Sequence, residues 1–237
     1  MKSLTLFLIA FIFSLNIYAD TVSDKEKEAL IKFYYATNGA NWKIKWDLSL
    51  SVSTWYGVQA ENGKVIGLYL DDNNLTGELP AEFFDLVNLV TIDLHKNSLQ
   101  GKLPAEIGKL KQLEVLSLFN NEIQGDLPSS IYQISTLKVL LLNSNKLSGT
   151  LSTEIINFHA LQNLSLFDNS FEGEIPKGLE KLHNLSEMNL SYNKFKGTVS
   201  KNLALLDPLN MTMFDEDGTP HLLEINTEKE TTIVTQN

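Results

Sequence analysis

The chain has 237 residues, of which 43% are hydrophobic and 20% are charged, so it can bury a sizeable core. It contains no cysteine and no arginine, and its formal net charge at pH 7 is −10. This composition excludes disulfides and disfavours binding to nucleic acid or phosphate, which carry charge of the same sign.

The N-terminal segment is predicted to be a secretory signal peptide. A basic head, Met1-Lys2, precedes a mostly apolar run from Leu4 to Tyr18. That run is shorter than the ~20 apolar residues that a helix needs to span a bilayer. We therefore expect residues 1–19 to be removed, giving a secreted or extracellular protein (periplasm or cell surface possible) without stable membrane insertion. An uncleaved anchor is the alternative, because Ile17 stands where a small residue is preferred.

Residues 20–64 are expected to form an N-terminal cap. Ser23 and Glu26 make a capping box, which predicts a helix that ends near Thr37. Residues 58–60 and 64–66 flank Glu-Asn-Gly, which predicts a β-hairpin. Between the helix and the hairpin lie three residues bulky enough to seal one end of a core: Trp42, Trp46 and Trp55.

From residue 65 to residue 208 the sequence repeats every 24 residues without an insertion. The first, fourth and sixth positions of each unit are apolar, which predicts a short strand with one buried face. The thirteenth position is always Gly, which suits a tight bend. A single unit cannot bury its apolar positions, so the units must stack around one core. The six units begin at Val65, Leu89, Leu113, Leu137, Leu161 and Leu185.

The ninth position of every unit is Asn. An Asn side chain both donates and accepts hydrogen bonds, so it can satisfy backbone groups where the chain leaves the strand. We expect a buried structural ladder of six such side chains: Asn73, Asn97, Asn121, Asn145, Asn169 and Asn193.

The repeat pattern LxxLxLxxNxLxGxLPxxIxxL resembles the plant-type class of leucine-rich repeats. The segment Trp55-Tyr56-Gly57-Val58 resembles the Trp-x-Gly-Val motif of that family's N-terminal cap, but without the cysteines that usually surround it. The resemblance implies an α/β solenoid with a parallel concave β-sheet, an irregular or 3₁₀ convex side and an N-terminal helical cap. Relatives of this kind act as receptor ectodomains and as inhibitors of secreted hydrolases.

Residues 209–237 are expected to hold a partial seventh repeat, a C-terminal cap and a tail. Residues 209–217 keep Leu209, Phe214 and Asp217 in register with the repeat. In the tail, residues 221–225 and 231–235 could form two short strands, with a frayed terminus as the alternative.

The sequence contains no specific catalytic or metal-binding motif. None of its four histidines falls in a ligand pattern such as HExxH, and nucleotide-binding and serine-nucleophile motifs are missing. Residues 215–218 resemble a calcium loop but lack its remaining ligands. We therefore expect no catalytic residue, no metal and no cofactor.

The residues that the repeat does not dictate are predicted to face solvent on the concave sheet. Phe119 and Phe167 should stand exposed there, two coils and ~10 Å apart. Exposed aromatic rings beside amides suit a peptide, a protein loop or a sugar face, although the rings could instead pack on each other. The predicted ligand-binding patch is Tyr69, His95, Phe119, Leu141, Asn143, Phe167, Asp168 and Tyr192.

These observations favour a non-catalytic extracellular module that binds a protein, peptide or glycan on its concave face. A structural or adhesive cell-surface protein is one alternative, and an inhibitor of a secreted hydrolase is another. An enzyme without a recognisable motif is a third, and it would depend on a single concave carboxylate or histidine.

Overall fold

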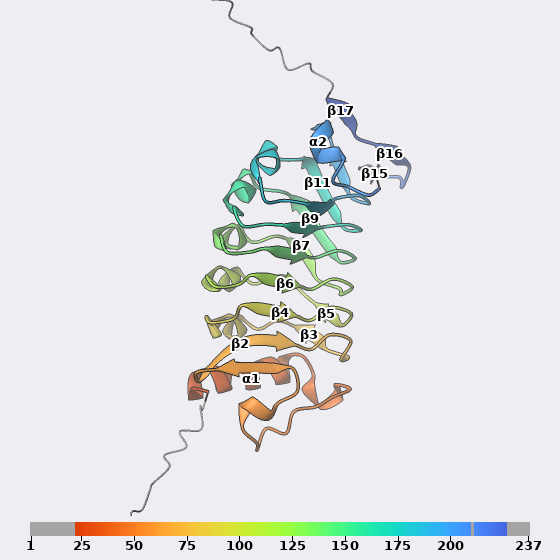
Figure 1. Cartoon of the computed structure of the whole chain (residues 1–237). Helices are drawn as coiled ribbons and strands as arrows, with labels where there is room; N and C mark the ends of the chain where they lie inside the picture. The colour runs from red at the N-terminus through yellow and green to blue at the C-terminus, as the bar shows by residue number, and fades with distance from the viewer. Residues whose placement is uncertain (1–21, 210, 227–237) are drawn as a thin grey trace, which may run out of the picture.

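The computed structural model describes residues 22–209 and 211–226, which form a curved stack of coils running from α1 to the C-terminal strands (Figure 1). The predicted α/β solenoid is confirmed, with a parallel sheet along one side and short 3₁₀ helices along another. Within the described residues no helix is long and apolar enough to cross a membrane. The predicted signal peptide lies outside the described residues.

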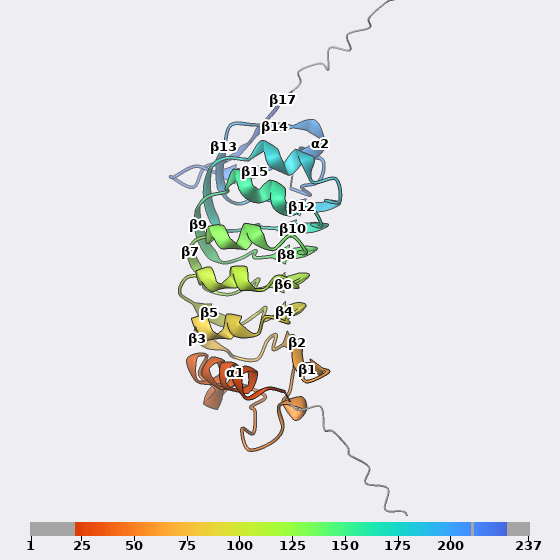
Figure 2. The ribbon, with the colours of Figure 1, turned by 90° about the vertical axis from the view of Figure 1, so that its left-hand side faces the viewer.

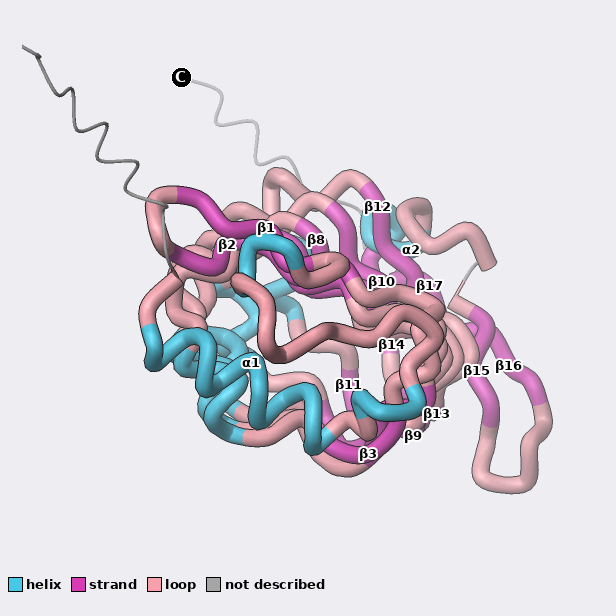
Figure 3. Tube along the Cα trace, turned by 90° about the horizontal axis from the view of Figure 1, so that it is seen from below, coloured by secondary structure: helices cyan, strands magenta, loops and turns pink. Residues whose placement is uncertain are grey.

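The N-terminal cap is built around helix α1 (Asp24–Ala36). The Ser23 hydroxyl accepts a hydrogen bond from the backbone N–H of Glu26 at 3.3 Å, as the capping box predicts. Seen along the stack, α1 lies across the end of the first coil (Figure 3). Two short 3₁₀ helices follow it, η1 (Gly39–Asn41) and η2 (Val52–Thr54).

The three tryptophans seal this end of the core. Each is at most 4% exposed, and the rings of Trp46 and Trp55 stack with centroids 4.8 Å apart. Their indole N–H groups donate to the backbone carbonyls of Thr37, Tyr56 and Asp47 at 2.8–2.9 Å. The large rings therefore cover the first coil without leaving a buried donor unpaired.

The concave sheet has seven strands in the order β1-β2-β4-β6-β8-β10-β12. β1 and β2 form the predicted antiparallel hairpin, and every later pair is parallel. Paired residues are 24 positions apart, as Leu116 and Leu140 show, so one repeat unit advances the sheet by one strand. The bounds are β1 (Val58–Glu61), β2 (Lys64–Tyr69), β4 (Thr91–Asp93), β6 (Val115–Ser117), β8 (Val139–Leu141), β10 (Asn163–Ser165) and β12 (Glu187–Asn189).

A second set of parallel strands, which the sequence analysis did not predict, lies on another side of the coils (Figure 2). These strands form in the part of each unit that follows the ninth-position asparagine and contains the turn at the thirteenth-position glycine. Gly125, for example, has φ = 78°, a conformation that a side chain would strain. The strands are β3 (Thr76–Glu78) with β5 (Ser98–Gln100), and β7 (Gln124–Asp126), β9 (Lys146–Thr150), β11 (Ser170–Glu174) and β13 (Lys194–Lys196).

The convex side carries one 3₁₀ helix in each of the first five coils, and these helices stack above one another in Figure 2. A proline precedes four of them. Ser152 replaces that proline before η6, and its side chain accepts a hydrogen bond from the N–H of Glu154 at 3.1 Å. The helices are η3 (Ala81–Asp85), η4 (Ala105–Lys109), η5 (Ser129–Gln133), η6 (Thr153–Asn157) and η7 (Lys177–Lys181).

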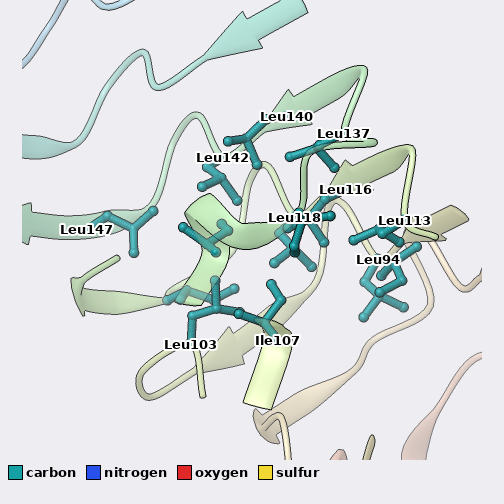
Figure 4. Packing of buried hydrophobic residues seen from close by; sticks show 14 of the residues in the cluster. Leu94, Leu103, Ile107, Leu113, Leu116, Leu118, Leu137, Leu140, Leu142 and Leu147 are labelled. Atoms are coloured by element: carbon teal, nitrogen blue, oxygen red, sulfur yellow. The ribbon is translucent and has the colours of Figure 1, made fainter. Parts of the chain in front are cut away.

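The core is a continuous column of hydrophobic side chains contributed by every coil, and Figure 4 shows some of those from the middle coils. Leu113 and Leu137 are fully buried, and Leu116 and Leu140 are 1% exposed. Ile107 of η4 closes the same column from the convex side and is also fully buried. The apolar side chains of each coil are therefore buried only when the neighbouring coils are in place.

The ninth-position asparagines connect each coil to the one before it. The Asn121 Oδ1 accepts from the N–H of Leu99 at 3.0 Å, and its Nδ2 donates to the carbonyls of Leu94 (3.0 Å) and Leu118 (2.9 Å). Asn73 instead bonds to Ile44 of the N-terminal cap. The Asn121 pattern recurs in Asn97, Asn145, Asn169 and Asn193.

Replacing Asn121 by Ala is expected to lower the free energy of unfolding by about 2–4 kcal/mol, because it leaves buried backbone donors and acceptors unpaired. Urea unfolding followed by circular dichroism measures the loss. The control is Asn157→Ala, at an exposed asparagine of η6, which should change stability by less than about 0.5 kcal/mol. Equal effects of the two substitutions would contradict the role given to Asn121.

A buried carboxylate, not a seventh strand, closes the last coil. Asp207 is 2% exposed, and one of its oxygens accepts from the N–H groups of Leu190 (2.8 Å) and Ser191 (3.1 Å). The other accepts from the Ser191 hydroxyl and the Leu209 N–H, both at 2.9 Å. In an earlier coil the equivalent N–H, that of Leu166, bonds to a carbonyl of the next strand. Asp207 thus takes the place of the missing strand.

The segment after Asp207 departs from the expected seventh unit. Strand β15 (Thr212–Phe214) pairs antiparallel with β16 (Pro220–Leu222), outside the concave sheet, in a hairpin that projects beside the stack (Figure 3). Strand β17 (Glu224–Asn226) pairs with β14 (Thr198–Ser200), which precedes helix α2 (Lys201–Ala204). The predicted strand 221–225 is therefore divided between two partners, and residues 231–235 lie outside the described residues.

Asp207→Ala is expected to destabilise the fold by about 2–4 kcal/mol, because several buried donors lose one shared acceptor. Scanning calorimetry measures this loss as a lower melting temperature. Glu216→Ala, at an exposed carboxylate of the β15–β16 turn, is the control and should leave the melting temperature nearly unchanged. A wild-type melting temperature for Asp207→Ala would show that the carboxylate does not hold the cap.

Candidate recognition site

The eight predicted patch residues occupy different settings on the concave side. Tyr69 ends β2 and Leu141 ends β8, whereas Asp168 and Tyr192 follow the strands. Asp168 (φ = 55°) and Tyr192 (φ = 60°) adopt the left-handed conformation in which the chain turns away from the sheet. These two are therefore turn residues at the edge of the concave surface.

Four rings of the patch pack in two pairs across neighbouring coils. The rings of His95 and Phe119 stack 4.2 Å apart at 14°, and those of Phe167 and Tyr192 lie 4.8 Å apart. Phe119 and Phe167 are both half-buried, so the expectation that they stand exposed is wrong. Adjacent parallel strands lie ~4.8 Å apart, which brings rings of neighbouring coils within packing distance. Phe119 stacks on His95 of the preceding coil, and Phe167 packs against Tyr192 of the following coil.

Two patch residues also have hydrogen bonds of their own. The His95 Nδ1 lies 2.6 Å from a carboxylate oxygen of Asp93, which orients the imidazole ring against Phe119. The Tyr69 hydroxyl donates to the Gln59 Oε1 at 3.2 Å, at the N-terminal end of the sheet. Only Asn143 separates the two aromatic pairs along the seventh-position row.

A hollow of about 540 Å³ opens at the C-terminal end of the concave sheet. We call it the concave hollow. Of the predicted patch, Phe119, Leu141 and Asn143 line it, whereas the other five residues do not. Its remaining lining comes from β10, β12, the residue before β12 and the cap segment 205–208: Asn163, Leu164, Ser165, Ser186, Glu187, Met188, Asn189, Leu205, Leu206 and Pro208.

Most of this lining could not be predicted from the sequence, for two reasons. Ser165 and Glu187 stand at solvent-facing strand positions, but they are polar and gave no signal beyond solubility. Leu205 and Pro208 lie near the end of the last unit, and only the turn that Asp207 fixes brings them against the sheet. The signal that could have indicated the part of the hollow formed by the sheet was the set of solvent-facing residues at the third and fifth repeat positions of the last three concave strands.

The concave hollow combines apolar walls with neutral hydrogen-bonding groups. Leu205, at its rim, is 73% exposed, and Phe119 and Leu141 are half-buried. The Asn163 amide donates to the carboxylate of Glu187. Glu187 is the one charged side chain in the lining. Such a surface can take an apolar side chain while its amides bond to polar backbone groups.

Ion pairing and burial shift the pKa values of several groups elsewhere on the molecule. Hydrogen bonding to Lys43 lowers the pKa of Asp72, and hydrogen bonding to Lys109 lowers the pKa of Asp85. Burial raises the pKa of the Tyr132 hydroxyl on the convex side. Within the described ranges, no group of three or more His, Asp and Glu side chains could hold a metal ion.

Comparison with known families identifies the repeat. A family model described as a leucine-rich repeat region matches residues 85–210, and a second, described as a leucine-rich repeat, matches residues 64–86. The chain belongs to the leucine-rich-repeat family. No curated protein matches it.

Solved structures of plant receptors share the fold. The ectodomain of the Arabidopsis thaliana receptor kinase SOBIR1 is 28% identical, with a TM-score of 0.63, over 74% of this chain and 97% of that one. The ectodomain of the A. thaliana receptor kinase GASSHO1/SCHENGEN3, in complex with CASPARIAN STRIP INTEGRITY FACTOR 2, is 38% identical, with a TM-score of 0.55. The Arabidopsis receptor kinase HAESA, in complex with the peptide hormone IDA and the co-receptor SERK1, is 35% identical, with a TM-score of 0.55.

The last two matches cover 56% of this chain, but only 16% of the GASSHO1 chain and 22% of the HAESA chain. This leucine-rich-repeat chain therefore spans a small part of those two ectodomains.

Proposed function

We propose that this leucine-rich-repeat chain is a non-catalytic extracellular module that binds a peptide, or an extended segment of a protein, on its concave face. The observation that carries the proposal is the concave hollow, an open site of about 540 Å³ between β8, β10, β12 and the C-terminal cap. Its volume lies within the ~300–1,000 Å³ range of ligand sites.

The chemistry of the lining fits an extended peptide better than a rigid polar ligand. Leu205 exposes most of its side chain, and Leu141 and Phe119 line the same hollow, so an apolar side chain can be buried there. Asn143 and Asn189 lie along the same surface and offer both donors and acceptors to a peptide backbone. A bound segment would thereby bury apolar surface without leaving its own polar groups unpaired.

The neighbouring structures support this proposal at the level of the ligand class. The HAESA structure holds a peptide hormone, and the GASSHO1 structure holds CASPARIAN STRIP INTEGRITY FACTOR 2. The predicted signal peptide agrees with a binding role outside the cell.

The one histidine–carboxylate hydrogen bond on the patch favours binding over catalysis. His95 bonds to Asp93 and stacks flat on Phe119, with 18% of its side chain exposed. This arrangement holds the aromatic pair in place at the N-terminal side of the concave hollow, because Phe119 is also part of the lining.

Filling the concave hollow is expected to abolish binding while the fold remains intact. Ser165 is half-buried on β10 and lines the hollow, so Ser165→Trp should occupy the space without disturbing the core. The probe is a displayed library of random twelve-residue peptides, from which the secreted wild-type chain should enrich binders. Their affinity for Ser165→Trp should fall at least about tenfold, the loss of one buried anchor.

The matched control is Thr91→Trp, at a half-buried residue of β4 outside the hollow, which should leave the affinity within about twofold of wild type. Circular dichroism checks that both variants fold. A library that yields no binder, or a Ser165→Trp variant that binds like wild type, would refute peptide binding in the concave hollow.

A further inference from the structure

The C-terminal cap forms a fixed wall of the concave hollow. Leu205, Leu206 and Pro208 line the hollow, and the buried Asp207 between them bonds to the last concave coil. Leu206 is tied further by its carbonyl, which accepts from the N–H of Met188 at 3.4 Å. This anchoring keeps Leu205 at the rim with 73% of the side chain exposed, where the core cannot absorb it.

Strand β12 brings one negatively charged side chain to the lining of the hollow. Glu187 is exposed on β12 and accepts a hydrogen bond from the neutral Asn163 amide. Among the described residues no lysine or histidine lies within ion-pair distance of Glu187. Three coils earlier, by contrast, Glu114 is paired with Lys138 at 2.8 Å.

The net charge of the whole chain has the same negative sign as Glu187. It has a formal net charge of −10 and no arginine, so the field at the hollow opposes an acidic ligand and attracts a basic one. Glu187 is exposed beside the apolar lining of the hollow, so its attraction for a basic group is subject to screening by salt. Apolar burial and charge complementarity therefore act on adjacent parts of one ligand.

Building on the proposed peptide-binding function, we propose that the concave hollow selects a peptide segment in which an aliphatic or aromatic side chain stands next to a positive charge. The apolar side chain would lie between Leu205, Leu141 and Phe119. The neighbouring lysine, arginine or amino terminus would pair with Glu187, while the concave amides bond to the peptide backbone.

The test measures binding of the secreted chain to four immobilised ten-residue peptides that differ only at two central positions. These are Leu-Lys, Leu-Glu, Leu-Ala and Ala-Lys in a constant Gly-Ser-Ala frame. The wild type should bind Leu-Lys most tightly and Leu-Glu least tightly. Its preference for Leu-Lys over Leu-Ala should shrink as salt is raised from 0.05 to 0.5 M, because salt screens an exposed ion pair.

Two variants separate the charge from the apolar contact. Glu187→Gln keeps the side-chain shape and should reduce the affinity for Leu-Lys about fivefold, while the affinity for Leu-Ala stays the same. Leu205→Ser should weaken binding of both leucine peptides and leave the lysine preference in place. The controls are Glu172→Gln on β11 and Leu222→Ser on β16, both exposed and outside the hollow, which should bind like wild type.

The outcomes distinguish this inference from the function on which it rests. If the leucine peptides bind and Glu187→Gln keeps the full preference for Leu-Lys, the assigned charge selection is wrong and peptide binding stands. If Leu205→Ser binds both leucine peptides like wild type, the apolar wall is wrong. If neither these peptides nor any library peptide binds the wild type, the proposed function itself fails.

Discussion

Where each coil leaves the concave strand, some backbone donors and acceptors have no backbone partner within their own coil. The side chain of the ninth-position asparagine supplies the missing partner. Asn121 bonds at the same time to its own coil, through Leu118, and to the preceding coil, through Leu94 and Leu99. Because an identical side chain does this in successive coils, the coils stack in one register. That register keeps equivalent strand positions side by side and makes the concave face a continuous surface.

The two ends of the stack solve the same problem by different means. At the N-terminus, tryptophans cover the first coil and Asn73 bonds to the cap. At the C-terminus, the Asp207 carboxylate takes the hydrogen bonds that a further strand would have taken. The second solution has a functional consequence, because the turn that places Asp207 against β12 also places Leu205 and Pro208 over the concave face. The end of the repeat and the wall of the candidate site are thus one structural feature.

Features that follow from a local sequence pattern could be predicted, and features that depend on residues far apart in the sequence could not. The strand positions, the hairpin at residues 58–66 and the Ser23 cap each follow from a local pattern with a known physical cause. The concave hollow is lined by residues far apart in the sequence, such as Leu141 and Leu205, which no local pattern relates. Phe119 was identified as a site residue, but its stacking on His95 depends on the neighbouring coil, so its exposure was overestimated.

We propose that ligand recognition takes place where the repeat array meets its C-terminal cap. Hydrogen–deuterium exchange, measured on the secreted chain with and without a peptide selected from a library, tests this claim most directly. The account predicts slower exchange in β8, β10, β12 and residues 205–209 when peptide is bound, with no change in α1 or in β7 and β9 of the second sheet. Protection confined to the N-terminal cap or to the second sheet, with β12 and residues 205–209 unchanged, would contradict it.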